Sequence, residues 1–191
     1  MAPAAVVTLV PVKAFSQAKR RLAPTLGPAE RSALARAMAD GVLAAASAAP
    51  VAVACDDVGV AQWAELRGAR VIWTAGLGLD GAVARGLEVL AADGHRQVIV
   101  AHADLPLATD LTRVARFPGV TIVPDRHDDG TNVLCVPAAS SFPFAYGPGS
   151  FRRHHALART LGHDVRIARL ADLSWDVDVP DDLVAISPAG V

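Results

Sequence analysis

Short apolar runs rich in β-branched residues alternate with longer alanine-rich stretches along almost the whole chain. This alternation predicts an α/β fold, in which parallel strands are joined by crossover helices. Several of the apolar runs contain no charged position, which is typical of strands covered on both faces. The predicted strands span residues 6–12, 51–54, 70–73, 97–101, 120–123, 132–136 and 165–168, and the predicted helices span 28–48, 58–67, 80–92, 109–116, 150–161 and 180–186.

No repeat, low-complexity linker or change of composition divides the chain, so residues 1–191 are expected to form a single domain with a mostly parallel central sheet. Hydrophobic residues make up 52% of the chain, which provides enough apolar surface to offset the loss of chain entropy. Residues 142–149 are rich in proline and glycine and predict a small inserted loop or hairpin. The longest apolar stretch, 41–55, is too short to cross a bilayer and contains Pro50, so no membrane partner is expected.

Positive and negative charges balance over the whole chain but are not evenly spread along it. The 18 lysine and arginine residues oppose 19 aspartate and glutamate residues, and this balance argues against a nucleic-acid partner. The two lysines, Lys13 and Lys19, nevertheless lie in one segment with Arg20 and Arg21, directly after the first predicted strand. Cations in this place suit the phosphates of a nucleotide, and a solvated basic face with helical spacing is the alternative.

Three aspartates are expected at the carboxyl edge of the sheet, where open α/β sheets bind their ligands. Asp104 follows the buried strand 97–101, and Asp176 and Asp178 alternate on an extended segment so that their side chains share a face. Carboxylates in such a set suit a Mg²⁺ ion that keeps open positions for phosphate oxygens. A solvated loop before the last helix is the alternative for Asp176 and Asp178.

Glycine-rich segments occur at two further strand ends. Gly76, Gly78 and Gly81 form a G-x-G-x-x-G pattern, but it follows the third strand, and Asp80 would place a carboxylate beside a pyrophosphate. A helix-capping turn therefore fits this pattern better than a nicotinamide site does.

The second glycine-rich segment, GPGS at 147–150, precedes a helix. Its backbone N–H groups and the Ser150 hydroxyl suit an anion, while capping of the helix by Ser150 is compatible with the same sequence. His154 lies one turn further along this helix and is expected to have a structural role.

An ordered set of motifs resembles the phosphoenolpyruvate / 2-phospho-L-lactate guanylyltransferase family of coenzyme F420 biosynthesis. The motifs are VPVK at 10–13, AKRRL at 18–22, ADLP at 103–106, DGTN at 129–132, GPGSF at 147–151 and DVD at 176–178. The resemblance covers the chain from the first strand to the last helix. It implies a Rossmann-like nucleotidyltransferase fold and transfer of GMP from GTP to the phosphate of a three-carbon acid, with release of pyrophosphate.

The resemblance also implies roles for individual residues. It makes Lys13, Lys19 and Asp104 catalytic, and it assigns Mg²⁺ to Asp104, Asp176 and Asp178. The phosphorylated acid is assigned to Thr131, Gly147 and Ser150, and GTP is assigned to Lys13, Lys19, Arg21, Gly78 and Asp80. Because the family often has asparagine where Asp80 stands, its contact with guanine is the weakest of these assignments.

The alanine-rich composition, with arginine used in place of lysine, is typical of a bacterial gene of high GC content, which by resemblance favours phosphoenolpyruvate over 2-phospho-L-lactate. A cytoplasmic location is expected, and a homodimer is compatible with the sequence. Two other functions stay open at this point: a related nucleotidyltransferase acting on a sugar phosphate or molybdopterin-type acceptor, and a non-catalytic nucleotide-binding module.

Overall fold

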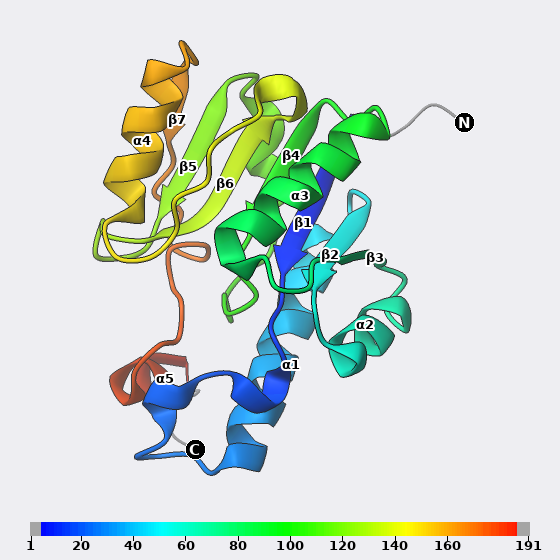
Figure 1. Cartoon of the computed structure of the whole chain (residues 1–191). Helices are drawn as coiled ribbons and strands as arrows, with labels where there is room; N and C mark the ends of the chain where they lie inside the picture. Colours follow the sequence, from blue (N-terminus) through cyan, green and yellow to red (C-terminus); the bar gives the residue numbers. More distant parts are fainter. Residues whose placement is uncertain (1–4, 187–191) are drawn as a thin grey trace.

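One seven-stranded sheet runs through the computed structural model, which describes residues 5–186 (Figure 1). Its strand order is β3-β2-β1-β4-β6-β5-β7. The strands are β1 (Val6–Pro11), β2 (Val51–Cys55), β3 (Arg70–Trp73), β4 (Gln97–Ala101), β5 (Val120–Pro124), β6 (Thr131–Pro137) and β7 (Val165–Ile167). All seven predicted strands are confirmed, and each of their ends agrees with the prediction to within one residue.

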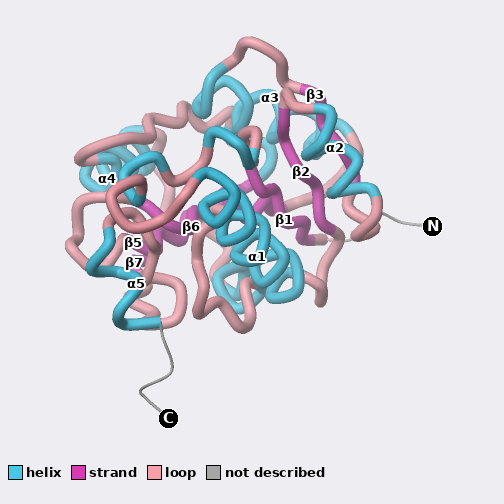
Figure 2. The backbone as a smooth tube through the Cα atoms, turned by 90° about the horizontal axis from the view of Figure 1, so that it is seen from below, coloured by secondary structure: helices cyan, strands magenta, loops and turns pink. Residues whose placement is uncertain are grey.

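Helices cover both faces of this sheet. The α-helices are α1 (Pro28–Ala46), α2 (Val58–Glu65), α3 (Gly78–Ala92), α4 (Ser150–Thr160) and α5 (Pro180–Ile186). Buried residues of α1 and α2 pack on one face, where Figure 2 shows α1 in front of the central strands. Buried residues of α3 and α4 pack on the other face, so the sheet is the middle layer of three.

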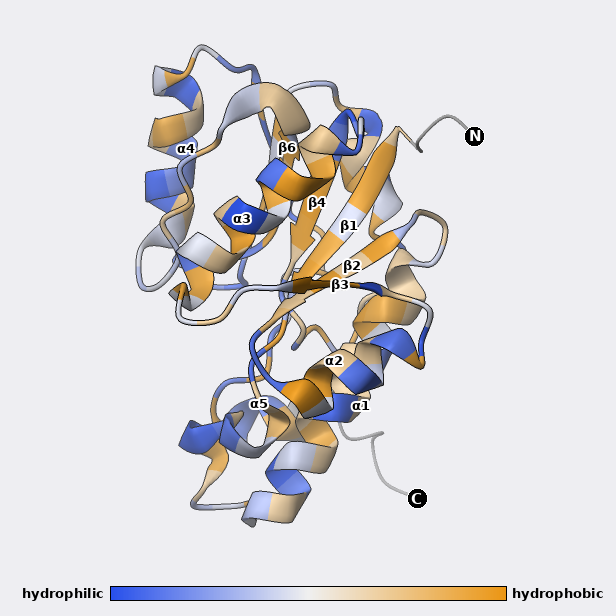
Figure 3. Cartoon of the chain, turned by 45° about the vertical axis from the view of Figure 1, so that its right-hand side comes forward, coloured by the Kyte–Doolittle hydropathy of each residue, from blue (hydrophilic) through white to orange (hydrophobic). Residues whose placement is uncertain are grey.

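The apolar residues concentrate in the sheet, whose strands β1, β2 and β4 are the most hydrophobic part of the molecule in Figure 3. Each of these strands sends alternate side chains into the two core clusters, which explains why their sequences lack charged positions. Within residues 5–186, no helix combines the length and the apolar character needed to cross a membrane.

The strand β6 runs antiparallel to both of its neighbours, β4 and β5, whereas the other pairs are parallel. The mostly parallel sheet is therefore confirmed, but the parallel direction that the alternation implied is wrong for β6. Only residues 125–130 join β5 to β6, which is too short for a crossover. The Asp125 carboxylate closes this turn by accepting the backbone N–H groups of His127, Asp129 and Gly130.

One predicted helix takes a tighter form. The stretch 109–116 contains the 3₁₀ helix η3 (Thr112–Arg116). The Asp110 carboxylate accepts hydrogen bonds from the backbone N–H and the hydroxyl of Thr112, and such local side-chain bonds compete with an α-helical turn. The basic segment is not one helical face: Lys19, with φ of 53°, separates the 3₁₀ turns η1 (Phe15–Gln17) and η2 (Arg20–Leu22). The inserted segment 142–149 is a loop and not a hairpin.

Close packing of α3 on β1 depends on a glycine. A Cβ atom added to Gly86 would overlap the side chain of Leu9, which is fully buried in β1. We expect Gly86→Ala to lower the free energy of unfolding by about 1–3 kcal/mol, because a well-packed core accommodates an added methyl group only by strain.

Urea denaturation measures this loss, and Gly41→Ala in α1, where an added Cβ meets nothing within 4 Å, is the control. The control should be neutral or slightly stabilising. Equal stabilities for Gly86→Ala and the wild-type protein would contradict the packing argument.

Candidate functional site

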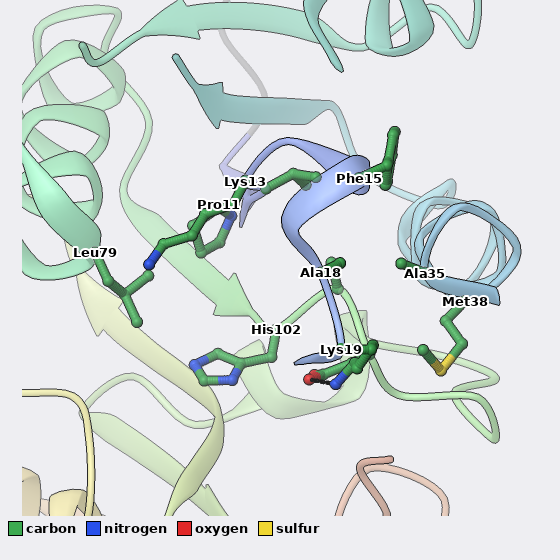
Figure 4. Close-up of a pocket in the computed structure, with 12 residues that line it drawn as sticks. Pro11, Lys13, Phe15, Ala18, Lys19, Ala35, Met38, Leu79 and His102 are labelled. Atoms are coloured by element: carbon green, nitrogen blue, oxygen red, sulfur yellow. Dashed lines mark hydrogen bonds and ion pairs between the residues drawn. The ribbon is translucent and has the colours of Figure 1, made fainter. Parts of the chain in front are cut away.

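Three adjoining cavities open at the carboxyl ends of β1, β2 and β4. The central cavity, of about 190 Å³, is lined by residues from the β1 loop, α1 and the end of β4 (Figure 4). The glycine cavity, of about 60 Å³, shares Lys13 and Leu79 with it and adds Asp56, Thr74 and Gly78. The acidic cavity, of about 300 Å³, shares His102 and Asp104 with the central cavity. The predicted ligand edge of the sheet is thus a continuous series of hollows.

Lys19 is the cation at the junction between the central and acidic cavities. Its side chain is only 9% exposed, and its Nζ lies 2.6 Å from Oδ2 of Asp104 and 3.2 Å from Oδ1 of Asp178. Burial alone would lower the pKa of Lys19, but the two carboxylates outweigh burial and raise the pKa above its usual value. Lys19 is therefore charged, and its left-handed backbone is a strained conformation that points to a functional position.

Asp104 lies in the loop that follows β4, and its two oxygens have different surroundings. Oδ2 accepts from Lys19, whereas Oδ1 is buried and has no hydrogen-bond partner among the described residues. Burial opposes the charge of this carboxyl group, but Lys19 and His102 lower its pKa below the usual value. Asp104 is therefore an ionised carboxylate with one oxygen available to a further positive group.

The segment that carries Asp176 and Asp178 is anchored by the residue between them. Val177 is fully buried and packs with Leu22 of η2 and Met38 of α1, so the two flanking carboxylates point the other way, into the acidic cavity. This small apolar cluster joins the basic segment to the acidic one. It brings Arg21 within 3.2 Å of Asp178, in addition to the Lys19 contact.

Asp176 has a more buried setting than Asp178. Its Oδ1 lies 3.5 Å from Nδ2 of Asn132 and 3.8 Å from the Arg126 guanidinium. Burial, followed by the charges of Asp104 and Asp178, raises the pKa of Asp176. The three aspartates therefore lie close enough for the charges of Asp104 and Asp178 to act on Asp176.

The same aspartates do not form a closed metal cage. Within residues 5–186, no group of three or more His, Cys, Asp or Glu side chains is arranged to hold a metal ion as it stands. Two of the carboxylates, those of Asp104 and Asp178, converge on one cation, the ammonium group of Lys19. The prediction of a magnesium site on Asp104, Asp176 and Asp178 stays a prediction.

The three residues predicted to bind the phosphorylated acid come together. Thr131, Gly147 and Ser150 all line the acidic cavity, as Asp104, Asp176 and Asp178 also do, although they are distant from these aspartates in the sequence. Ser150 does not cap α4, because the N-cap is Gly149, with φ of 73° and no side-chain bond. The serine is instead the first residue of the helix, where N–H groups face an anion favourably.

The loop 142–149 is held by side chains on three elements. Arg153 of α4 donates to the carbonyl oxygens of Ala145, Tyr146, Gly147 and Pro148. Asp129 accepts the N–H of Gly149, and Asp80 accepts the N–H of Tyr146 at 2.8 Å. These bonds place the partial negative charges of the loop carbonyl groups against the Arg153 guanidinium group.

The residues predicted to meet the nucleotide are not gathered in one cavity. Lys13 and Gly78 line the glycine cavity, Lys19 lines the central cavity, and Arg21 lines the acidic cavity. Asp80 binds the loop 142–149 and is not among the residues that line the three cavities. Figure 4 shows His102 and Lys19 opposite Pro11, with Leu79 beside the space. The geometry therefore gives Asp80 a structural contact, and its contact with guanine stays a prediction.

Sequence reasoning missed two residues that position the acidic segment. Asp182 is 3% exposed, and its Oδ2 accepts the backbone N–H groups of Asp178 and Val179. Arg126 donates to the Asp176 carbonyl oxygen, pairs with Asp182, and lies over the Trp175 ring at 4.3 Å from its centroid. A capping pattern before 180–186 could have indicated Asp182; nothing in the sequence singles out Arg126.

Comparison with known proteins gives one family. The family model described as "Guanylyl transferase CofC like" matches residues 6–190. The chain is 37% identical over 186 residues to a phosphoenolpyruvate guanylyltransferase of Sphaerobacter thermophilus, covering 93% of this chain and 90% of the relative. It is 39% identical over 181 residues to the protein of the same name from Roseiflexus castenholzii, covering 92% of this chain and 85% of the relative.

Solved structures share the fold at low identity. A protein described as a nucleotide-diphospho-sugar transferase, from Desulfovibrio desulfuricans G20, superposes with a TM-score of 0.76 at 16% identity, covering 94% of this chain and 85% of its own. The 4-diphosphocytidyl-2C-methyl-D-erythritol synthase of Anaerococcus prevotii gives a TM-score of 0.61 at 10% identity, covering 94% and 95%. These matches confirm the Rossmann-like nucleotidyltransferase fold.

Proposed function

The chain belongs to the CofC-like guanylyl transferase family, and from this premise we propose that it transfers GMP from GTP to the phosphate of phosphoenolpyruvate. The observation that carries the proposal is the contact between Lys19 and Asp104 at the junction of the central and acidic cavities. A reaction that joins two phosphates needs two binding spaces that meet at a charged centre, and the junction is such a centre.

The two substrates have distinct places in this arrangement. The glycine and central cavities share Lys13, and together they suit the base and triphosphate of GTP. The acidic cavity, of about 300 Å³, has the size for a small phosphorylated acid. Its hydroxyl and backbone groups, from Thr131, Gly147 and Ser150, suit the carboxylate and phosphate oxygens of that acid.

The chemistry needs alignment and charge neutralisation more than it needs a protein nucleophile. An oxygen of the acceptor phosphate forms a bond to the α-phosphorus of GTP, and the bond from that phosphorus to the β-phosphate oxygen breaks, so that pyrophosphate leaves with the bonding electrons. The acceptor phosphate is already ionised near neutral pH, so no general base is required. Lys13, Lys19 and Arg21 reduce the repulsion between the two anionic substrates.

Mg²⁺ is part of the proposal, and the donor chemistry of the site fits it. The Oδ1 of Asp104 is buried and has no partner within residues 5–186, and Asp104 and Asp178 face the same cation, Lys19. Mg²⁺ is commonly held by one or two carboxylates together with substrate phosphates, so a closed cage of three aspartates is not required. Asp104 and Asp178 would hold the ion, with Asp176 nearby; when bound, the ion supplies further positive charge to the phosphates.

The proposal is tested by a matrix of four nucleoside triphosphates against several acceptors, with Mg²⁺ present and pyrophosphate release as the readout. Release is expected with GTP and phosphoenolpyruvate, and it should depend on both. Release with GTP and 2-phospho-L-lactate, but not with GTP and phosphoenolpyruvate, would contradict the proposed acceptor and support the proposed reaction type. Preference for CTP or a sugar phosphate, or no release with any phosphorylated three-carbon acid, would contradict the proposed function.

A further inference from the structure

His154 lies at the junction between α4, β6 and the loop 142–149, and each of its ring nitrogens has one partner. The residue is fully buried. Its Nε2 lies 3.0 Å from the backbone nitrogen of Ala145, and its Nδ1 lies 3.0 Å from Oγ1 of Thr131. The ring therefore links a loop residue to one of the residues that line the acidic cavity.

The chemistry of these partners determines which nitrogen carries the proton. A backbone N–H can only donate, so Nε2 must accept the bond from Ala145 and cannot be protonated. In the neutral ring the proton is then on Nδ1, which must donate to the Thr131 hydroxyl oxygen. Burial, with the nearby charges of Arg153 and His102, lowers the pKa of His154 to about 4, so the neutral ring predominates at neutral pH.

The direction of the Thr131 hydroxyl follows from this assignment. Its oxygen already accepts the proton of His154, so its own proton must point to another acceptor. Thr131 lines the acidic cavity, where the acceptor substrate is proposed to bind. We infer that His154 is a positioning residue that makes Thr131 a hydrogen-bond donor toward an anionic oxygen of the acceptor substrate.

The second bond of the ring supports the same pocket from the other side. Ala145 precedes Gly147 by two residues in the loop 142–149, so Nε2 fixes the segment that carries Gly147. The rings of Tyr146 and Phe142 pack against His154, with centroids 4.8 Å and 6.0 Å away. The imidazole thus joins Thr131 and the Gly147 segment through one rigid group.

This inference rests on the proposed function, and its first test does not require turnover. A ¹⁵N-labelled sample of the wild-type protein at neutral pH should show the His154 ring neutral, with the proton on Nδ1 and a bare Nε2. A ring protonated on Nε2, or charged at neutral pH, would overturn the inference. This result is independent of whether GTP and phosphoenolpyruvate are the substrates.

The second test measures the kinetics of His154→Phe, which keeps an aromatic ring at this buried position, although a larger one, and loses both bonds. We expect the KM for phosphoenolpyruvate to rise about tenfold, the effect of about 1.4 kcal/mol, while the KM for GTP changes by less than about twofold. The His154→Gln variant can accept with Oε1 and donate with Nε2, so it should recover most of the affinity for the acceptor. Leu157→Ala is the matched control, because Leu157 lies on α4 and packs against the same core cluster as Phe142 but lines none of the three cavities, and it should change neither KM.

A double-mutant cycle separates positioning from general loss of structure. In the Thr131→Val background, which has no hydroxyl to orient, His154→Phe should raise the acceptor KM by no more than about threefold. Equal effects in both backgrounds, or parallel increases in the KM values of GTP and phosphoenolpyruvate, would overturn the inference. Absence of turnover in the wild-type protein would contradict the proposed function and leave the tautomer result to decide the role of His154.

Discussion

Replacement of Asp104 by asparagine is expected to lower kcat by about 10²- to 10³-fold, while the protein stays folded. The substitution keeps the size of the side chain but removes the negative charge at the junction of the two substrate cavities. The amide oxygen would face the Lys19 ammonium group, so the NH2 group would replace the buried oxygen that has no partner among the described residues and that we propose for Mg²⁺. Lys19 keeps Asp178 as a partner, at 3.2 Å, so the basic segment should hold its place.

Steady-state rates of pyrophosphate release at saturating substrates, together with a thermal melt, measure this prediction. Asp93→Asn is the matched control, since Asp93 follows α3 at the opposite end of the sheet and pairs with Arg70. The control should retain the wild-type kcat. A kcat of Asp104→Asn within about threefold of the wild-type value would show that this carboxylate does not take part in the reaction.

Lys19→Met is expected to reduce both activity and stability. Its ammonium group is the shared partner of Asp104 and Asp178, so its loss leaves two neighbouring carboxylates in mutual repulsion. Removal of one member of a buried ion pair costs about 3–5 kcal/mol. We expect a loss at the lower end, about 3 kcal/mol in the free energy of unfolding, because the Asp104 side chain is 23% exposed and water partly screens its charge. The value of kcat/KM for GTP should fall by at least about a hundredfold, since the triphosphate loses a charge partner.

Urea denaturation and initial rates test this prediction, with Arg85→Met as the control. Arg85 is exposed on α3 and pairs only with Glu88 of the same helix in the described residues, so its loss should be nearly neutral. Millimolar Mg²⁺ should restore part of the stability of Lys19→Met by taking the place of the ammonium group. A stability equal to that of the wild-type protein without Mg²⁺ would contradict the account of the Lys19 contacts.

Strand ends were the most informative part of the sequence. Parallel strands place their carboxyl ends at one edge, so Lys13, Asp104 and Asp178 could be assigned to one region without coordinates. The resemblance then added Thr131, Gly147 and Ser150, which line one cavity in the structure. Patterns that depend on strand direction and residue type were therefore sufficient to predict that these side chains gather around the cavities at this edge of the sheet.

Contacts that depend on three-dimensional packing could not be predicted in the same way. The placement of Asp176 and Asp178 depends on Val177, Leu22 and Met38, which come from three distant segments. The antiparallel direction of β6 depends on the short turn 125–130, which the hydrogen bonds of Asp125 close, whereas the alternation of strands and helices implied a parallel strand. The bond from Asp80 to the loop 142–149 likewise joins residues 66 positions apart, and no local pattern indicates it.

The central claim is that this protein forms a new phosphate–phosphate bond between GMP and a phosphorylated three-carbon acid. The most direct measurement is ³¹P NMR of a reaction containing the protein, GTP, phosphoenolpyruvate and Mg²⁺. We expect two mutually coupled phosphorus signals of a mixed diphosphate, one from each substrate, together with one equivalent of pyrophosphate. Orthophosphate and GDP as the products, or unchanged phosphoenolpyruvate while GTP is consumed, would contradict it.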